Sequence, residues 1–150
     1  MDPAEVREQV LRNHAALRAA VYEVEALARS VLEGSRGLFR ELSDLGESLL
    51  ESLESHIAWE DDHLIPVLRG GPRWGEEREA LLRQDHREQR QVLRYLLERL
   101  RDRERPAHLL AHNLLDFSAM LRDDMRDEEQ VMLEAEVPQR DARNIDLEAS

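Results

Sequence analysis

Six residues of the types that bind metal ions stand where the helical pattern of this chain would place apolar residues. His56 and Glu60 are four residues apart, so they lie on the same face of a helix. They continue an apolar stripe formed by Leu45, Leu49 and Leu53. A carboxylate on a buried stripe is costly unless it is paired or bound to a metal. The full set of polar residues at such positions is His14, His56, Glu60, His86, Asp124 and Glu128.

Four long segments with a 3.6-residue apolar period must position these residues, and no segment has the pattern of a strand. The first begins at Asp2 and Pro3, a favourable N-cap followed by a proline at the first helical position. The predicted helices cover about residues 3–32, 38–68, 76–103 and 106–135. Because short loops favour antiparallel neighbours, the predicted fold is all-α, an up-down-up-down antiparallel four-helix bundle. We assign residues 1–135 to this four-helix bundle and residues 136–150 to a polar C-terminal tail.

The six polar residues are predicted to lie at one height in this bundle. In an antiparallel bundle the starts of the first and third helices lie beside the ends of the second and fourth. With a rise of about 1.5 Å per residue, the six then fall within roughly one and a half turns of each other. A weak internal repeat supports this arrangement, because His56-x-x-x-Glu60 on the second helix has its counterpart in Asp124-x-x-x-Glu128 on the fourth.

Three imidazoles and three carboxylates in one buried layer need positive charge to offset them, and two divalent transition metal ions would supply it. A mixed nitrogen and oxygen ligand set favours iron first and manganese second, or a mixed pair. Glu60 and Glu128, each one turn beyond a predicted terminal ligand, are placed to bridge the two ions. The sequence therefore predicts a two-metal centre in the middle of a helical bundle.

The composition restricts the class of protein. The net charge of −12 argues against nucleic acid and an anionic membrane surface as partners, because no basic face exists to neutralise phosphates. The absence of cysteine excludes disulfides and thiolate metal sites. The N-terminus lacks a leader pattern and no apolar run approaches 18 residues, so we expect a cytoplasmic protein. Every one of the 21 basic residues is arginine, which we interpret as the base composition of a GC-rich bacterial genome.

The ordered set of motifs resembles the hemerythrin-like (HHE cation-binding) domain family over about residues 5–134. The motifs are NHAALR, HIAWEDDHLIP, DHREQR and DDMRDEEQVML, one for each predicted helix. The resemblance implies a non-heme di-iron site whose ions share an oxo or hydroxo bridge. It also implies a protein that binds or senses O2 or a related small oxidant, or that takes part in iron and oxidative-stress handling.

Two positions depart from the pattern of hemerythrin proper. The second histidine of the third helix is replaced by Arg90, and the histidine of the fourth helix is replaced by Asp124. The resemblance then implies His14 and His56 on one ion, His86 and Asp124 on the other, and Glu60 and Glu128 between them. An oxygen-richer ligand set stabilises ferric iron, so we predict a lower reduction potential than in a five-histidine relative, to be checked by electrochemistry. The nearest candidates to complete the ligand shell are Asp85, Gln89, Asp123 and His63.

Several alternatives stay open at this point. Glu60 and Glu128 would be purely structural if Arg90 paired with them across the core. His63 forms Glu60-x-x-His63, a ferritin-like signature, but no second copy exists, so we interpret it as a rim residue. The same centre in an oxidase or peroxide-reducing enzyme is the first functional alternative, and a metal-free helical interaction module is the second. The sequence decides neither whether the protein is an enzyme nor whether it is a monomer or a homodimer.

Overall fold

The computed structural model describes residues 1–71, 75–102 and 104–133, and these form helices without any strand. The long helices are α1 (Pro3–Leu32), α2 (Phe39–Arg69), α3 (Gly75–Arg101) and α4 (Ala107–Asp127). A short 3₁₀ turn, η1 (Arg36–Leu38), precedes α2, and a π-helical segment, η2 (Glu128–Leu133), continues α4. The prediction of an all-α bundle is confirmed. The predicted tail, residues 136–150, lies outside the described residues.

Local chemistry explains where the first helix begins and ends. Asp2 accepts a hydrogen bond from the backbone N–H of Glu5, and Glu5 accepts one from the backbone N–H of Asp2, which is a capping box. At the other end Gly34 has φ +111°, a conformation that other residues adopt only with strain. These two features determine the length of α1 and therefore the height of His14 in the bundle.

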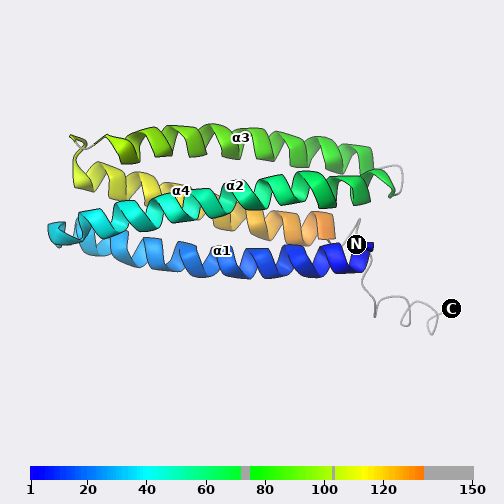
Figure 1. Ribbon diagram of the computed structural model, residues 1–150, viewed down its shortest axis with the longest axis horizontal. Coiled ribbons are helices and arrows are strands. Elements are labelled where there is room, and N and C mark those ends of the chain that lie inside the picture. Colours follow the sequence, from blue (N-terminus) through cyan, green and yellow to red (C-terminus); the bar gives the residue numbers. More distant parts are fainter. Residues whose placement is uncertain (72–74, 103, 134–150) are drawn as a thin grey trace.

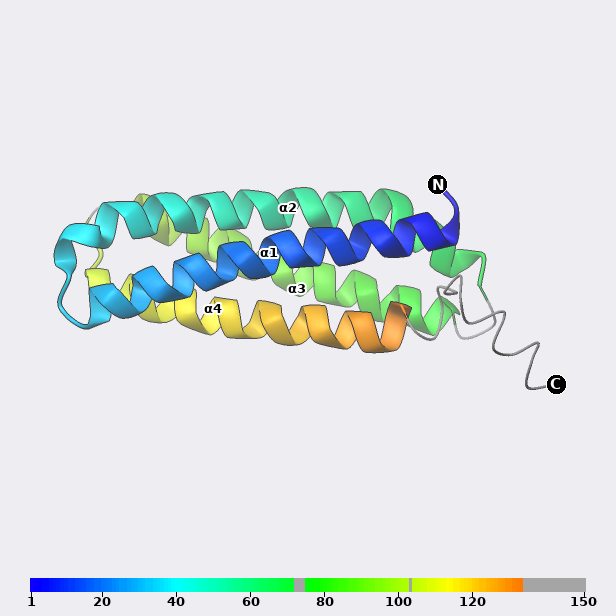
Figure 2. The ribbon, with the colours of Figure 1, turned by 90° about the horizontal axis from the view of Figure 1, so that it is seen from below.

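The four helices run side by side with alternating direction (Figures 1 and 2). The starts of α1 and α3 lie at the same end of the bundle as the ends of α2 and α4. This is the arrangement that brings the four sequence motifs to one height. None of the described helices combines the length and apolarity needed to span a lipid bilayer.

The apolar core is divided into two parts by a polar layer. The larger part contains Leu17 and Leu53 and extends toward the η1 end, whereas the smaller part contains Val10, Leu64 and Leu82. Along each helix the predicted metal-binding residues lie between the two parts of the apolar core or at the edge of its larger part. The polar layer is therefore sealed by apolar side chains on both sides, which makes any uncompensated charge within it expensive.

Candidate metal centre

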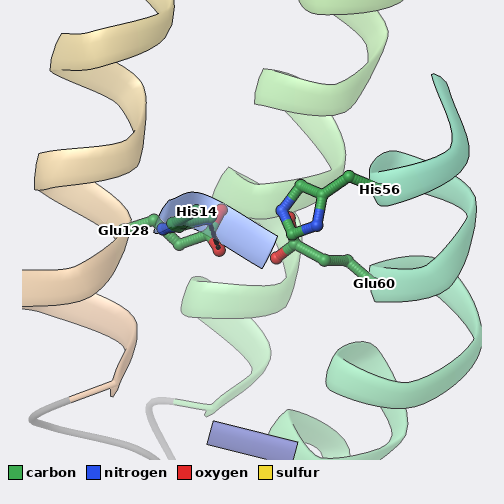
Figure 3. A group of neighbouring side chains, drawn as sticks. All are labelled: His14, His56, Glu60 and Glu128. Carbon is green, nitrogen blue, oxygen red and sulfur yellow. Dashed lines mark ion pairs between the residues drawn. The ribbon is translucent and has the colours of Figure 1, made fainter. Parts of the chain in front are cut away.

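Four of the six predicted residues converge on one point. His14 from α1, His56 and Glu60 from α2, and Glu128 at the start of η2 each offer one donor atom, and these atoms all lie within 4.8 Å of one another. Figure 3 shows the four side chains pointing toward one another across the bundle. Ligands that share one ion lie roughly 3 to 3.5 Å apart when each bond is about 2.1 Å, so the wider limit of 4.8 Å leaves room for an ion among the four atoms.

The contacts within the group are short, but His56 Nε2 makes no hydrogen bond of acceptable geometry. His56 Nε2 lies 2.6 Å from Glu60 Oε1, and His14 Nε2 lies 3.3 Å from Glu128 Oε1. His56 Nε2 is nevertheless buried. Buried polar atoms are normally satisfied, so such atoms call for a partner of another kind. Within the described part of the chain the buried atoms of this layer that lack a partner are His14 Nδ1, His56 Nδ1 and Nε2, Glu60 Oε2, His86 Nε2 and Glu128 Oε1.

His86 from α3 approaches the same group from the opposite side. It is 2% exposed, and its Nε2 lies 3.8 Å from Glu60 Oε1. That carboxylate oxygen is therefore near the imidazoles of both His56 and His86, which come from different helices. The structure thus brings His86 next to the group, although not into the set of four.

Asp124 is placed differently from the other five residues. Its carboxylate is half-buried and accepts a hydrogen bond of 3.0 Å from Gln89 Nε2. Met125, which is 3% exposed, is the residue of this turn that packs in the main core. Asp124 is not a member of the group of four, so its role as a ligand stays a prediction.

The electrostatics of the layer follow from its burial. Burial lowers the pKa of His14 from 6.5 to about 4, so this imidazole is held in the neutral form that binds metal. Burial and the negative charge of Glu60 raise the pKa of Glu128 well above 4.5. For Glu60 burial acts in the same direction, but its interactions with His56, His86 and Glu128 outweigh burial and lower its pKa. The two carboxyl groups thus share one negative charge, and a cation would allow both to ionise.

Two acidic residues that were not among the predicted ligands or shell candidates also belong to the site. Asp61 Oδ1 accepts a hydrogen bond of 2.8 Å from His86 Nδ1, and Glu129 Oε2 lies 3.7 Å from His14 Nδ1. Arg90 pairs with Asp61, Nη2 to Oδ2 at 2.9 Å, which is a different partner from the Glu60 or Glu128 of the structural alternative. A signal for these residues was present in the sequence, because an acidic residue directly follows each of Glu60 and Glu128.

The interpretation of His63 as a rim residue agrees with its surroundings. Its ring stacks on Trp59 with centroids 4.7 Å apart, and its Nδ1 donates to the backbone carbonyl of Trp59 at 3.0 Å. The described structure therefore gives His63 a partner outside the group of four.

A buried layer of histidine and glutamate donors inside an antiparallel four-helix bundle defines a metal-binding helical protein. The family comparison agrees: the model of the hemerythrin HHE cation-binding domain matches residues 6–135, and the chain belongs to this family. No curated protein and no solved structure matched the chain.

Proposed function

We propose that this protein holds two iron ions in the polar layer and binds or senses O2 or a related small oxidant there. Manganese or a mixed pair is the alternative metal content. The observation that carries the proposal is the convergence, onto one layer, of buried donor atoms from α1, α2, α3 and η2 that have no hydrogen-bond partners. Iron bound at this site would supply the redox chemistry with which small oxidants react.

The residues of the layer have distinct roles in the proposal. His14 and His56 hold the first ion, and Glu60 and Glu128 lie between the two positions. His86 and Asp124 hold the second ion, with Gln89 keeping the Asp124 carboxylate in place. Because Asp124 has a competing partner, we expect the first ion to bind more tightly than the second.

A groove between α1 and α2 leads toward the first position. It has a volume of about 390 Å³ and is bordered by small side chains, among them Ala16, Ala20 and Ser52. His56 and Trp59 also line it. A small neutral molecule can approach His56 through this groove, whereas the apolar core closes the layer along the bundle axis. We include the groove in the proposal as the entry route of the oxidant.

The second candidate function is an oxidase or peroxide-reducing enzyme that uses the same centre. It is favoured by the proportion of oxygen ligands, since three of the six predicted ligands are carboxylates. The metal-free interaction module becomes the weaker alternative, because family membership and the histidine and glutamate cluster both support metal binding.

The test of the proposed function is the optical spectrum of the iron-loaded protein, with the iron content measured in parallel. We expect two iron atoms per chain and charge-transfer bands of a bridged ferric pair after exposure to O2. Return of the spectrum to baseline under argon identifies a carrier or sensor, whereas turnover of peroxide with an electron donor identifies the enzyme. A protein that takes up no iron under reducing conditions contradicts both functions and supports the interaction module.

Blocking the groove tests the entry route. Ser52 is exposed at the mouth of the groove, so Ser52→Phe should fold normally and fill the space next to His56. We expect reoxidation of the ferrous protein, followed by stopped-flow absorbance, to slow roughly tenfold, which corresponds to about 1.4 kcal/mol of added barrier.

The matched control for the groove is Ser48→Phe. Ser48 is an exposed serine one helical turn earlier on α2 and is not among the groove residues. The control should keep the wild-type rate at equal iron content. Equal rates for Ser52→Phe and the wild type would show that the oxidant enters elsewhere.

A further inference from the structure

The two arginines one turn after His14 and His86 belong to matching arrangements on opposite sides of the polar layer. Arg18 follows His14 by four residues on α1, and Arg90 follows His86 by four residues on α3. Each arginine contacts an acidic residue that directly follows one of the two central glutamates. The same histidine, acid and arginine arrangement thus occurs twice around the polar layer.

On the α2–α3 side all the contacts are hydrogen bonds. His86 Nδ1 donates to Asp61 Oδ1 at 2.8 Å, and Arg90 Nη2 donates to Asp61 Oδ2 at 2.9 Å. The two oxygens of one carboxylate therefore join the imidazole to the guanidinium. Asp61 is 27% and Arg90 is 32% exposed, so the pair lies between the buried layer and solvent.

On the side of α1 and η2 a histidine, an arginine and an acidic residue again lie together, with Glu129 in the place of Asp61. Arg18 pairs with both oxygens of Glu129, through Nη1 to Oε1 at 3.0 Å and through Nη2 to Oε2. Glu129 Oε2 lies 3.7 Å from His14 Nδ1, which is longer than a hydrogen bond. The side chain of Glu129 is 21% exposed. The arrangement is thus the same, with a looser contact to the imidazole.

We propose that Asp61 with Arg90, and Glu129 with Arg18, are positioning residues for the metal ligands His86 and His14. A carboxylate at Nδ1 keeps the proton on that nitrogen, so the lone pair of Nε2 faces the layer, where both Nε2 atoms lie near a central glutamate. The arginine holds the carboxylate and balances its charge, so the added acid does not increase the negative charge of the layer. This inference rests on the proposed metal site and deepens it.

The proposal also gives Arg90 a function. By the family resemblance, Arg90 occupies the position of a ligand histidine, and taken alone this substitution suggests a degraded centre. In the structure Arg90 holds Asp61 against His86, and its equivalent Arg18 stands at the same spacing after His14. The substitution therefore replaces a direct ligand by support for the ligand that remains.

The test uses the full-length chain titrated with Co²⁺, whose visible d–d spectrum reports the ligand geometry. Asp61→Asn keeps the shape of the side chain but removes the carboxylate. We expect its cobalt affinity to fall about 10- to 100-fold, with altered band positions. Asp62→Asn, the exposed neighbouring acid, is the control and should match the wild type.

Variants of Arg90 separate positioning from a general effect on folding. Arg90→Met should reproduce much of the loss seen for Asp61→Asn, whereas Arg90→Lys, which keeps the charge, should recover part of it. Combining Asp61→Asn with Arg90→Met should cost less than the sum of the single changes, because the two residues act through one contact. Circular dichroism and thermal melting of the metal-free variants verify that each one folds.

The outcomes distinguish this inference from the function on which it rests. If the wild type binds cobalt and Asp61→Asn binds it equally well with the same spectrum, the positioning role is wrong and the metal site stands. If the wild type binds neither cobalt nor iron, the metal site and the positioning role fall together. A wild-type spectrum for Asp61→Asn with a loss only in melting temperature would also overturn the inference, because it shows a purely structural contact.

Discussion

Replacing Glu60 by glutamine is expected to reduce metal affinity by more than roughly a hundredfold, about 3 kcal/mol. The estimate follows from the apparent 10–16 kcal/mol of a four-ligand zinc site, divided among its ligands. Glu60 is 1% exposed, and its Oε1 lies near the imidazoles of both His56 and His86. Its loss should therefore affect both metal positions. Isothermal titration with Fe²⁺ under anaerobic conditions, with iron analysis after desalting, measures the effect.

The matched control for this prediction is Glu25→Gln. Glu25 is also a buried carboxylate, at 6% exposure, but it pairs with Arg122 and Arg29 at a distance from the polar layer. Its replacement should lower the melting temperature and leave the number of bound ions and their affinity unchanged. Wild-type affinity in Glu60→Gln would remove Glu60 from the ligand set.

Metal affinity is expected to fall as the pH is lowered, by about tenfold per pH unit for each proton that the metal displaces. Two groups contribute. Burial and the charge of Glu60 raise the pKa of Glu128 well above 4.5. For His86 burial acts to lower the pKa, but its contacts with Glu60 and Asp61 outweigh burial and raise it above 6.5. Below these raised values both groups carry a proton that a metal ion must replace, and above them the affinity becomes independent of pH.

Glu128→Gln tests the assignment of one of these protons. Glutamine has the shape of the protonated glutamic acid but has no proton to lose, so the slope of log affinity against pH should decrease by one below the raised pKa of Glu128. Competition titrations with a chelator of known pH dependence provide the slopes. An unchanged slope in the variant would mean that Glu128 is already ionised before the metal binds.

The same shift predicts the pH dependence of stability in the metal-free protein. When folding raises the pKa of a carboxyl group, that group destabilises the folded state at every pH above the pKa that it has in the unfolded chain. This loss of stability disappears as the pH falls from the raised pKa of Glu128 toward 4.5. The free energy of unfolding of the wild type, relative to that of Glu128→Gln, should therefore increase as the pH falls through this range. Urea unfolding at a series of pH values measures the difference.

The bundle and its polar layer could be predicted from local patterns. Four long stretches with a helical apolar period and short connections leave few arrangements other than an antiparallel bundle. The rise per residue then places His14, His56, Glu60 and His86 at similar heights, because helix geometry is the same in every helix. In the structure four of the six predicted ligand residues converge. They are His14, His56, Glu60 and Glu128, whereas His86 lies next to this group.

The details of each side chain depended on contacts between helices, which local patterns do not contain. Asp124 lies four residues before Glu128, as His56 lies four residues before Glu60. The carboxylate of Asp124 nevertheless accepts a hydrogen bond from Gln89 of α3. Asp61 appears in an acidic run typical of a solvated surface, but packing of α3 against α2 places His86 and Arg90 on either side of it.

What the sequence determined by itself was the fold class, the height of the polar layer and the kind of ligand in it, because periodicity and residue type are properties of one helix at a time. What only the tertiary structure decided was the partner of each polar atom. A rotation of a helix by a few tens of degrees leaves its apolar period unchanged but exchanges one hydrogen-bond partner for another. The pairing of Arg90 with Asp61, and of Arg18 with Glu129, belongs to this second kind of information.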